Sequence, residues 1–290
     1  MIAQQLVNGL MLGSVYALIG IGYTLVFGVL RMLNLAHAYL FMAAPFVALS
    51  LGAAGVHPAL ALAGGLGAAA LLGMVLYYMA FRPISSQHAL GGFVTSLSFG
   101  IVLQVIVVNR FGTLAKPFTF GLALPDIEVG PVLLSGLQAA SLVVSAALMV
   151  GLLLLLKRTR FGRNVRAIAE NDTAALLLGV PVPRNILAVF ALSSGLAGLA
   201  GLMVALRFEQ IGAYMGDHYA TKALAVIVIG GLGDVRGAMA AGLLLGVFEV
   251  LFQAYAPTGW SEAFVWLLLI GVFLLKPEGI FGTGVQRREV

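Results

Sequence analysis

The sequence predicts an all-α integral membrane protein, a polytopic helical bundle of eight or nine transmembrane segments with broken or re-entrant helices. Charged residues make up 9% of the 290 residues and apolar residues 61%, whereas a soluble domain carries roughly 25% charged residues. Residues in membrane β-strands alternate between polar and apolar, but stretches such as 152–156 and 267–270 are apolar throughout. The spans are therefore expected to be helices. Four long runs contain no Asp, Glu, Lys or Arg: 1–30, 32–81, 83–109 and 130–156.

Nine segments qualify as candidate spans, because a bilayer core of about 30 Å requires about 20 helical residues. In chain order they are 6–30, 34–51, 58–80, 90–108, 132–156, 186–206, 220–233, 237–255 and 261–275. Two or three are too short or too broken to count as full crossings. The weakest is 220–233, which ends in a glycine cluster followed by Asp234 and Arg236. Such a segment is expected to be a half-helix or re-entrant piece packed inside protein.

The first segment is expected to stay in the protein. A signal peptide has a basic stretch ahead of its apolar core, whereas the first basic residue here, Arg31, follows that core. Trp260, before the last segment, fits an aromatic anchor at the outer membrane interface. The chain has no cysteine, which excludes disulfides, thiol catalysis and cysteine-based metal sites.

The basic residues predict the topology. Lys and Arg cluster in a loop between spans, and the positive-inside rule explains such a cluster without nucleic acid as a partner. The chain is therefore interpreted as one transmembrane domain, 1–290, with a cytoplasmic loop at 157–185. The C-terminal tail is also predicted to be cytoplasmic, and the N-terminus and the loop 109–131 to lie outside. The basic residues behind this prediction are Lys157, Arg158, Arg160, Arg163, Arg166 and Arg184, with Lys276, Arg287 and Arg288 in the tail.

Small residues recur at four-residue spacing in three segments. This spacing places each set on one helix face, where missing side chains let two backbones approach closely. Ordinary helix packing is the simpler interpretation, and a hinge or gate is the alternative. The sets are Gly9, Gly13 and Ala17; Ala197, Gly201 and Ala205; and Ala238, Gly242 and Gly246.

The cytoplasmic loop is expected to form short amphipathic helices. Val165 and Ile168, and then Leu176 and Leu177, fall near helical period. Asp172 is the predicted N-cap of the second helix, which Gly179 and Pro181 would end. A short helix on the inner face suits docking into a groove of another protein. The alternative is a basic loop that only sets topology.

Three blocks of sequence resemble one known family. Ala174, Ala175 and Gly179 match the coupling-loop motif of ABC importer permeases (Glu-Ala-Ala, three residues, Gly), although Thr173 replaces the glutamate and the nearby acids are Glu170 and Asp172. The stretches 16–28 and 33–37 look like the opening signature of the branched-chain amino acid permease family, with Ala38 where the family often has glycine. The stretch 225–242 is similar to that family's glycine-rich break. Order and spacing agree over nearly the whole chain.

The resemblance implies the fold of an ABC importer permease in the cell inner membrane. Such a subunit forms the translocation pathway for branched-chain amino acids or related small solutes. It works with a second homologous permease, two cytoplasmic ATP-binding subunits and an extracytoplasmic solute-binding protein. The chain has no phosphate-binding loop ending in Gly-Lys-Ser or Gly-Lys-Thr, so no enzymatic activity and no cofactor are expected. The predicted ATPase-coupling residues are Arg163, Glu170, Thr173, Ala174, Ala175 and Gly179.

The pathway candidates are the polar or flexible residues that interrupt apolar helix. Asn34 and His37 are spaced to share one helix face and line a route for a polar solute. Irregular backbone at membrane depth is tolerated where it lines a cavity. The alternatives are helix-to-helix hydrogen bonds and close helix packing. The candidates in the glycine break are Gly230, Gly231 and Gly233.

Two alternative functions are an ion-coupled secondary transporter and an intramembrane enzyme. An ion-coupled secondary transporter would show several intramembrane ionisable residues. Here Glu249 stands nearly alone inside a span, and an isolated acid that snorkels or stays protonated is expected rather than a proton relay. An intramembrane enzyme would require a metal cluster or an activated nucleophile, but the four histidines are scattered. Neither the solute nor the identity of the second permease follows from the sequence.

Overall fold

A computed structural model describes residues 2–84, 89–121, 125–129, 132–255, 260–276 and 279–280, and this part of the chain is almost entirely helical. Strand β1 (Lys116–Pro117) pairs with β4 (Gln210–Ile211), and β2 (Ile127–Val129) pairs with β3 (Val132–Leu134), both antiparallel. The helices are α1 (Ile2–Leu30), α2 (His37–Ala53), α3 (Pro58–Leu76) with its π-helical extension η1 (Tyr77–Phe81), α4 (Ala89–Phe111), α5 (Gly136–Arg158), α6 (Arg160–Glu170), α7 (Asp172–Leu177), α8 (Val182–Phe208), α9 (Met215–Gly230), α10 (Val235–Tyr255) and α11 (Ser261–Leu275).

Each of the nine predicted spans coincides with one of these helices, which confirms an all-α membrane architecture. Six helices in the described ranges are long and apolar enough to cross a bilayer. The other three, α2, α9 and α11, have 17, 16 and 15 residues. At 1.5 Å per residue they extend only about 23–26 Å. Helix α9 is packed inside the protein along much of its length, as predicted for 220–233, although it begins earlier, at Met215.

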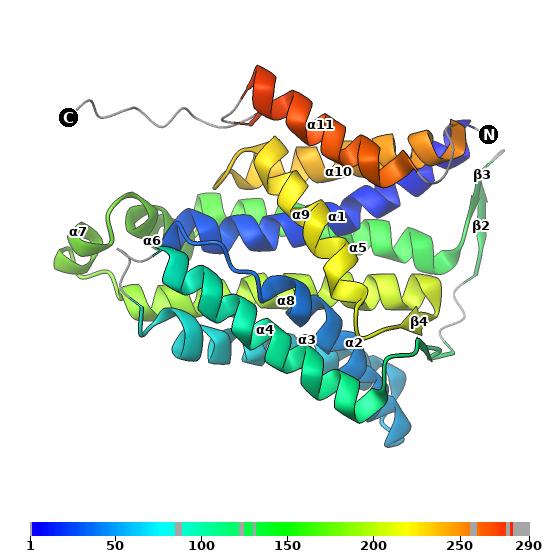
Figure 1. The fold of residues 1–290 in the computed structure, drawn as a ribbon, viewed down its shortest axis with the longest axis horizontal. Coiled ribbons are helices and arrows are strands. Elements are labelled where there is room, and N and C mark those ends of the chain that lie inside the picture. Colours follow the sequence, from blue (N-terminus) through cyan, green and yellow to red (C-terminus); the bar gives the residue numbers. More distant parts are fainter. Residues whose placement is uncertain are drawn as a thin grey trace.

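The bundle has two distinct ends (Figure 1). Helices α6 and α7 lie at one end, called here the α7 end, and strands β2, β3 and β4 lie at the other, called the strand end. The loop 109–131, predicted to be the longest outer loop, belongs to the strand end. There it is joined to the α8–α9 connection, because Lys116 pairs with Ile211 across β1 and β4.

Helix α1 runs through the centre of the bundle and packs closely on α10. A Cβ added at Gly13 would lie 2.7 Å from the carbonyl oxygen of Leu243, and one added at Gly242 would lie 2.5 Å from the Cα of Ala17. The first and third predicted small-residue faces therefore face each other. The second face, on α8, packs on α2, where Gly201 meets the backbone of Phe41. All three faces serve close helix packing.

The connection between α1 and α2 corrects one sequence prediction. The span predicted from residue 34 begins as a helix only at His37, so Asn34 and His37 do not share a helix face. Arg31 adopts a left-handed backbone conformation (φ 54°) at the end of α1. From there the chain runs back into the bundle without regular structure, and α2 starts well inside it (Figure 1). Met32, Asn34 and Ala36 in this connection are all buried. The start of α2 depends on the burial of this connection, and the spacing of residues in the sequence does not reveal that burial.

Candidate functional site

The N-terminus of α2 is surrounded by uncharged polar side chains. Tyr23 of α1, Asn34, His37 of α2 and Ser193 of α8 are all buried, and together they form what we call the neutral cluster. The His37 ring lies 4.5 Å from the Tyr23 ring, centroid to centroid. It fits against Gly22, where an added Cβ would lie 2.5 Å from two of its ring atoms. The buried start of α2 is therefore enclosed by α1 and α8.

The neutral cluster leaves most of its hydrogen-bonding capacity unused. Ser193 Oγ donates to the carbonyl of Gly22 at 2.8 Å and lies 3.4 Å from His37 Nδ1. Within the described residues, four of its buried atoms have no partner: Tyr23 Oη, His37 Nε2 and both amide atoms of Asn34. Buried polar atoms in native proteins are nearly always paired, with protein or water. A cluster of this kind can exchange hydrogen bonds with a polar molecule that passes it.

A second buried cluster carries charge. Lys222 of α9 lies with its Nζ 2.7 Å from Glu249 Oε1 of α10, and the two side chains are 3% and 4% exposed. Tyr16 of α1 donates to Glu249 Oε2 at 2.9 Å, and Gln253 donates to Oε1 at 3.3 Å. These four residues, called the ionic cluster, join α1, α9 and α10. Glu249 is therefore not the isolated acid that the sequence analysis expected.

Lys222 also borders a charged cavity between α9 and α11. The cavity has a volume of about 230 Å³, and its lining includes Asp217, His218 and Glu262. His218 Nδ1 lies 3.4 Å from Glu262 Oε1. On the other side of α9, Gln104 of α4 donates to Asp217 Oδ2 at 3.3 Å. The first two turns of α9, next to the strand end, thus carry charges of both signs.

The glycine break after α9 lies near the α7 end, away from the neutral cluster. Gly231 (φ 101°) and Gly233 (φ 91°) adopt conformations that L-side chains rarely reach. A Cβ added at Gly230 would lie 2.5 Å from the backbone of Gly237, so close packing of α9 on α10 accounts for this glycine. Asp234 Oδ1 then accepts from the backbone N–H groups of Arg236 and Gly237, at 2.8 and 3.2 Å, and caps α10.

The loop 157–185 forms two short helices, as predicted. Thr159 caps α6, accepting from Gly162 N at 3.2 Å, and Asn171 caps α7, accepting from Ala174 N at 2.9 Å. The N-cap is therefore Asn171, not the predicted Asp172, which is the first helical residue. Arg31 donates to the carbonyl of Ala169 at 3.4 Å and Arg166 donates to that of Leu156, so α6 is held against the ends of α1 and α5.

The buried and exposed residues of α7 differ from those that the coupling-loop motif predicts. Ala175 is only 2% exposed and packs against its own chain. The exposed apolar residues are Leu176, Leu177 and Leu178, at 58%, 83% and 84%. Gly179 (φ 82°) ends the helix, where its N–H bonds to the carbonyl of Leu176 at 3.0 Å. The remaining predicted coupling residues are also exposed: Arg163, Glu170, Thr173 and Ala174.

Comparison with known proteins identifies the family. The family model described as the permease component of branched-chain amino acid transport systems matches residues 5–273. The chain belongs to this family. Over 292 residues it is 34% identical to the high-affinity branched-chain amino acid transport system permease protein LivH of Salmonella typhimurium, covering 96% of this chain and 95% of LivH. It is 31% identical to the corresponding permease protein BraD of Pseudomonas aeruginosa, with the same coverage.

A third relative matches over a shorter range. The autoinducer 2 import system permease protein LsrC of Klebsiella pneumoniae is 34% identical over 131 residues, which is 42% of this chain and 37% of LsrC. Members of the branched-chain amino acid permease family thus share part of their sequence with a permease named for a different solute. The residues that distinguish solutes do not follow from the match alone.

In this member of the family, sequence reasoning missed Lys222. The available signal was a pair of opposite charges within spans, Lys222 and Glu249, lying on either side of the glycine break and 27 positions apart. Two opposite charges on consecutive spans are a signal for an ion pair, because two helices joined by a short turn can pack side by side. Within the described ranges, no group of three or more His, Asp or Glu side chains is arranged to hold a metal ion.

Proposed function

We propose that the chain is the transmembrane permease subunit of an ABC importer for branched-chain amino acids or related small solutes. The observation that carries the proposal is the family match over residues 5–273, supported by relatives named as permeases of branched-chain amino acid transport. The chain would pair with a second homologous permease. Two cytoplasmic ATP-binding subunits would supply energy, and an extracytoplasmic binding protein would deliver the solute.

The proposed topology places the α7 end in the cytoplasm and the strand end outside. The basic loop 157–185 and Arg31 lie together at the α7 end, which supports this orientation through the positive-inside rule. The chain would form a single multi-pass domain, 1–290, with eight or nine crossings of the inner membrane. Its C-terminus would be cytoplasmic, although residues 281–290, with Arg287 and Arg288, lie outside the described residues.

Cysteine labelling tests the orientation cleanly, because the chain has no cysteine of its own. Glu170→Cys on α6 and Leu114→Cys near the strand end are both at exposed positions. An impermeant thiol reagent applied to intact cells should label position 114 and leave position 170 unlabelled until the membrane is opened. The reverse pattern would refute the topology.

The proposed coupling surface is α7 and the exposed face of α6. Leu176, Leu177 and Leu178 present apolar side chains that no described part of the chain covers, and such a patch is typical of a helix that docks in a partner's groove. Ala175 would act indirectly, by allowing α7 to pack on its own chain. Ala174 and Thr173 would belong to the contact, flanked by Arg163 and Glu170.

The coupling proposal is tested by the charge substitution Leu177→Asp. Because Leu177 is 83% exposed, the permease should still insert and fold, while ATP-binding subunits should no longer co-purify with it. Leu114→Asp, at a leucine that is 79% exposed near the opposite end, is the matched control and should leave assembly intact. Normal assembly of the Leu177 variant would contradict the coupling role of α7.

The proposed pathway runs past the start of α2. An amino acid carries two charged groups and cannot cross hydrocarbon without a protein-lined route. The neutral cluster offers unpaired donors and acceptors, and the N-terminus of α2 adds a partial positive charge that favours a carboxylate. Asn34 and His37 would line this route. Gly231 and Gly233 would act as a hinge at the cytoplasmic end of α9, with Gly230 allowing its packing.

The solute class is tested in proteoliposomes that hold the permease with its ATP-binding subunits and binding protein. Uptake of radiolabelled leucine should require ATP and the binding protein, and unlabelled isoleucine and valine should compete. Uptake driven by a proton or sodium gradient without ATP would instead support an ion-coupled secondary transporter. If only a sugar-like or amide solute competes, the transported solute belongs to another class.

A further inference from the structure

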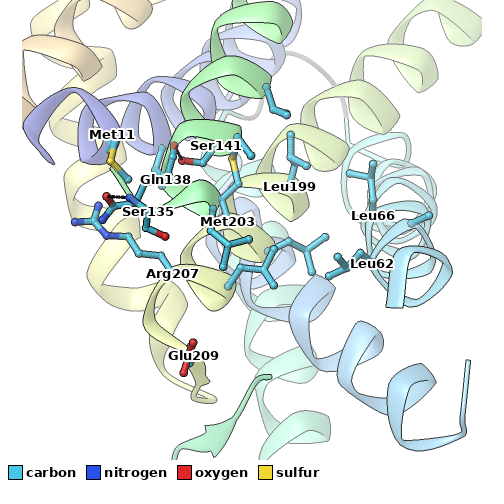
Figure 2. Close-up of a pocket in the computed structure, with 17 residues that line it drawn as sticks. Met11, Leu62, Leu66, Ser135, Gln138, Ser141, Leu199, Met203, Arg207 and Glu209 are labelled. Carbon is cyan, nitrogen blue, oxygen red and sulfur yellow. Dashed lines mark hydrogen bonds between the residues drawn. The ribbon is translucent and has the colours of Figure 1, made fainter. Parts of the chain in front are cut away.

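A large cavity lies between α1, α3, α5 and α8, and its lining shares no residue with either polar cluster. Its volume is about 480 Å³, within the range of known ligand pockets. Leu62 and Leu66 of α3 line one side, Leu199 and Met203 of α8 line the floor, and Ser141 of α5 lies across from them (Figure 2). Most of the lining is aliphatic, so the cavity suits an apolar occupant rather than water.

The surface around the cavity is apolar on both sides. Leu60 and Leu71 of α3 are 65% and 61% exposed, and Val143 and Val150 of α5 are 68% and 56% exposed. Side chains of this kind on a membrane-spanning helix face lipid tails. Helix α5 itself has few buried positions, and it packs on α1 rather than on α3. The cavity is therefore continuous with the surface that hydrocarbon covers.

One end of the cavity carries a cation. Arg207, in the last turn of α8, is half-buried and extends into the cavity beside Ser135 and Gln138 (Figure 2). Among the described residues its guanidinium has no hydrogen bond or ion pair, and its Cζ lies 5.5 Å from the ring centroid of Phe208. Glu209 lines the same end of the cavity.

We propose that this cavity binds an anionic phospholipid, with one acyl chain along its aliphatic walls and the phosphate held by Arg207. A guanidinium at the end of a membrane helix is matched to phosphate in charge and geometry. The aliphatic lining matches the tail, and the order of the two features along α8 matches the order of headgroup and tail in one leaflet. This lipid site is independent of the proposed transport function, because it requires only that the chain spans a membrane.

A bound lipid would support α5, which otherwise has few neighbours. Its tail would fill the space between α3 and α5 that no side chain occupies. Helix α5 continues into α6 with only Thr159 between them. Lipid in the cavity would thus stabilise α5, from which the α6–α7 segment extends. We therefore expect the thermal stability of the chain to increase when lipid is bound.

Native mass spectrometry of the full-length chain tests the site with two lipids of identical tails. The probes are palmitoyl-oleoyl-phosphatidylglycerol, which is anionic, and palmitoyl-oleoyl-phosphatidylcholine, which is zwitterionic. The wild-type chain should retain phosphatidylglycerol at least tenfold more tightly. Arg207→Gln should remove that preference, while Arg110→Gln, which removes an exposed cation from the last turn of α4, should preserve it.

A second variant tests the tail. Ala140→Phe fills the aliphatic part of the cavity and should weaken retention of both lipids, while Val143→Phe on the exposed face of α5 should not. Elution volume and helical content must match the wild type in every variant. Undiminished phosphatidylglycerol binding in the folded Arg207 or Ala140 variant would overturn the proposal. An equal loss in the Arg110 variant, or displacement of the lipid by inorganic phosphate, would also overturn it.

The assembled transporter gives an independent measurement. The lipid should remain bound when the permease is purified with its partner subunits. If the complex holds no lipid there and Ala140→Phe instead blocks pairing with the second permease, the cavity is a protein interface and the lipid assignment fails.

Discussion

The ionic cluster and the neutral cluster are both buried in the bundle and both touch α1, yet they are organised in opposite ways. In the ionic cluster, Glu249 receives hydrogen bonds from Lys222, Tyr16 and Gln253. In the neutral cluster, the amide of Asn34 and Nε2 of His37 have no partner in the part of the chain that the structure describes. The two full charges are thus paired with each other, whereas the weaker dipoles have open donors and acceptors.

The difference follows from what each kind of group costs when it is buried. An unpaired charge inside a membrane is expensive, so Lys222 and Glu249 are stable there only together. An unpaired amide or imidazole costs less, about 1–3 kcal/mol, which the rest of the fold can offset. The ionic cluster therefore links three helices, whereas the neutral cluster keeps the donors and acceptors that the proposed pathway would use.

Removing one charge should have the largest effect on stability. Lys222→Met leaves Glu249 buried without its counter-ion, and such a loss typically costs about 3–5 kcal/mol. The variant should show a much lower midpoint of unfolding in a detergent titration. The double variant Lys222→Met with Glu249→Leu, which removes both charges, should recover most of that loss. If the double variant is no more stable than the single one, the two residues do not act as a pair.

Tyr16→Phe should have an intermediate effect. The substitution removes one hydrogen bond to Glu249 and keeps the ring, and a hydrogen bond to a charged group contributes about 1.5–3 kcal/mol. The same titration measures the loss. Tyr16→Phe added to the double variant without charges should cost much less, because its acceptor is gone. An equal cost in both backgrounds would assign the effect to ring packing.

Gln253→Leu should have a smaller effect, within about 1 kcal/mol. Its bond to Glu249 is longer, at 3.3 Å, and Gln253 lies one turn further along α10. Uptake should remain near the wild-type rate, since this residue only supports the ionic cluster. A severe transport defect in a stable Gln253 variant would place the ionic cluster on the pathway.

Asn34→Leu should change stability least and transport most. Replacing an unpaired buried amide by an aliphatic group of similar size should leave the unfolding midpoint unchanged or slightly raised. Solute uptake should fall at least tenfold, while ATP-binding subunits still co-purify. Ser98→Ala is the control, because Ser98 is exposed and bonds only to Val94 in its own helix. Loss of uptake that follows loss of stability would make Asn34 a structural residue.

The helices could be predicted from the sequence far better than the contacts between them. Each charge-free run forms one or two helices. The reason is that every backbone N–H and C=O group within the hydrocarbon must form a hydrogen bond inside the protein. The small-residue faces were also readable, and Gly13 and Gly242 do lie at one interface. The non-helical start of α2 and the partner of Glu249 depend on which helices are neighbours. The periodicity of a single segment carries no information about that.

The buried side of α7 could not be predicted from the sequence either. Ala174 and Ala175 are equally small and adjacent, and the motif treats them alike, yet one is exposed and the other is 2% exposed. Which side of a six-residue helix faces its own chain is fixed by the way α6 packs against α1, α5 and α8. The proposed coupling surface is therefore centred on the exposed Leu177 rather than on the buried Ala175.

The pairing of Lys222 with Glu249 also bears on how the chain is made. On insertion scales, a single charge at the centre of a membrane helix costs about 2.5–3.5 kcal/mol, and α9 is short as well as charged. During synthesis Lys222 emerges 27 residues before Glu249, so α9 leaves the ribosome before its counter-ion exists. The turn at Gly231 lets the two helices fold back on each other. Entry of the two helices into the lipid as one hairpin would bring the two charges in together and so lower the cost of inserting each.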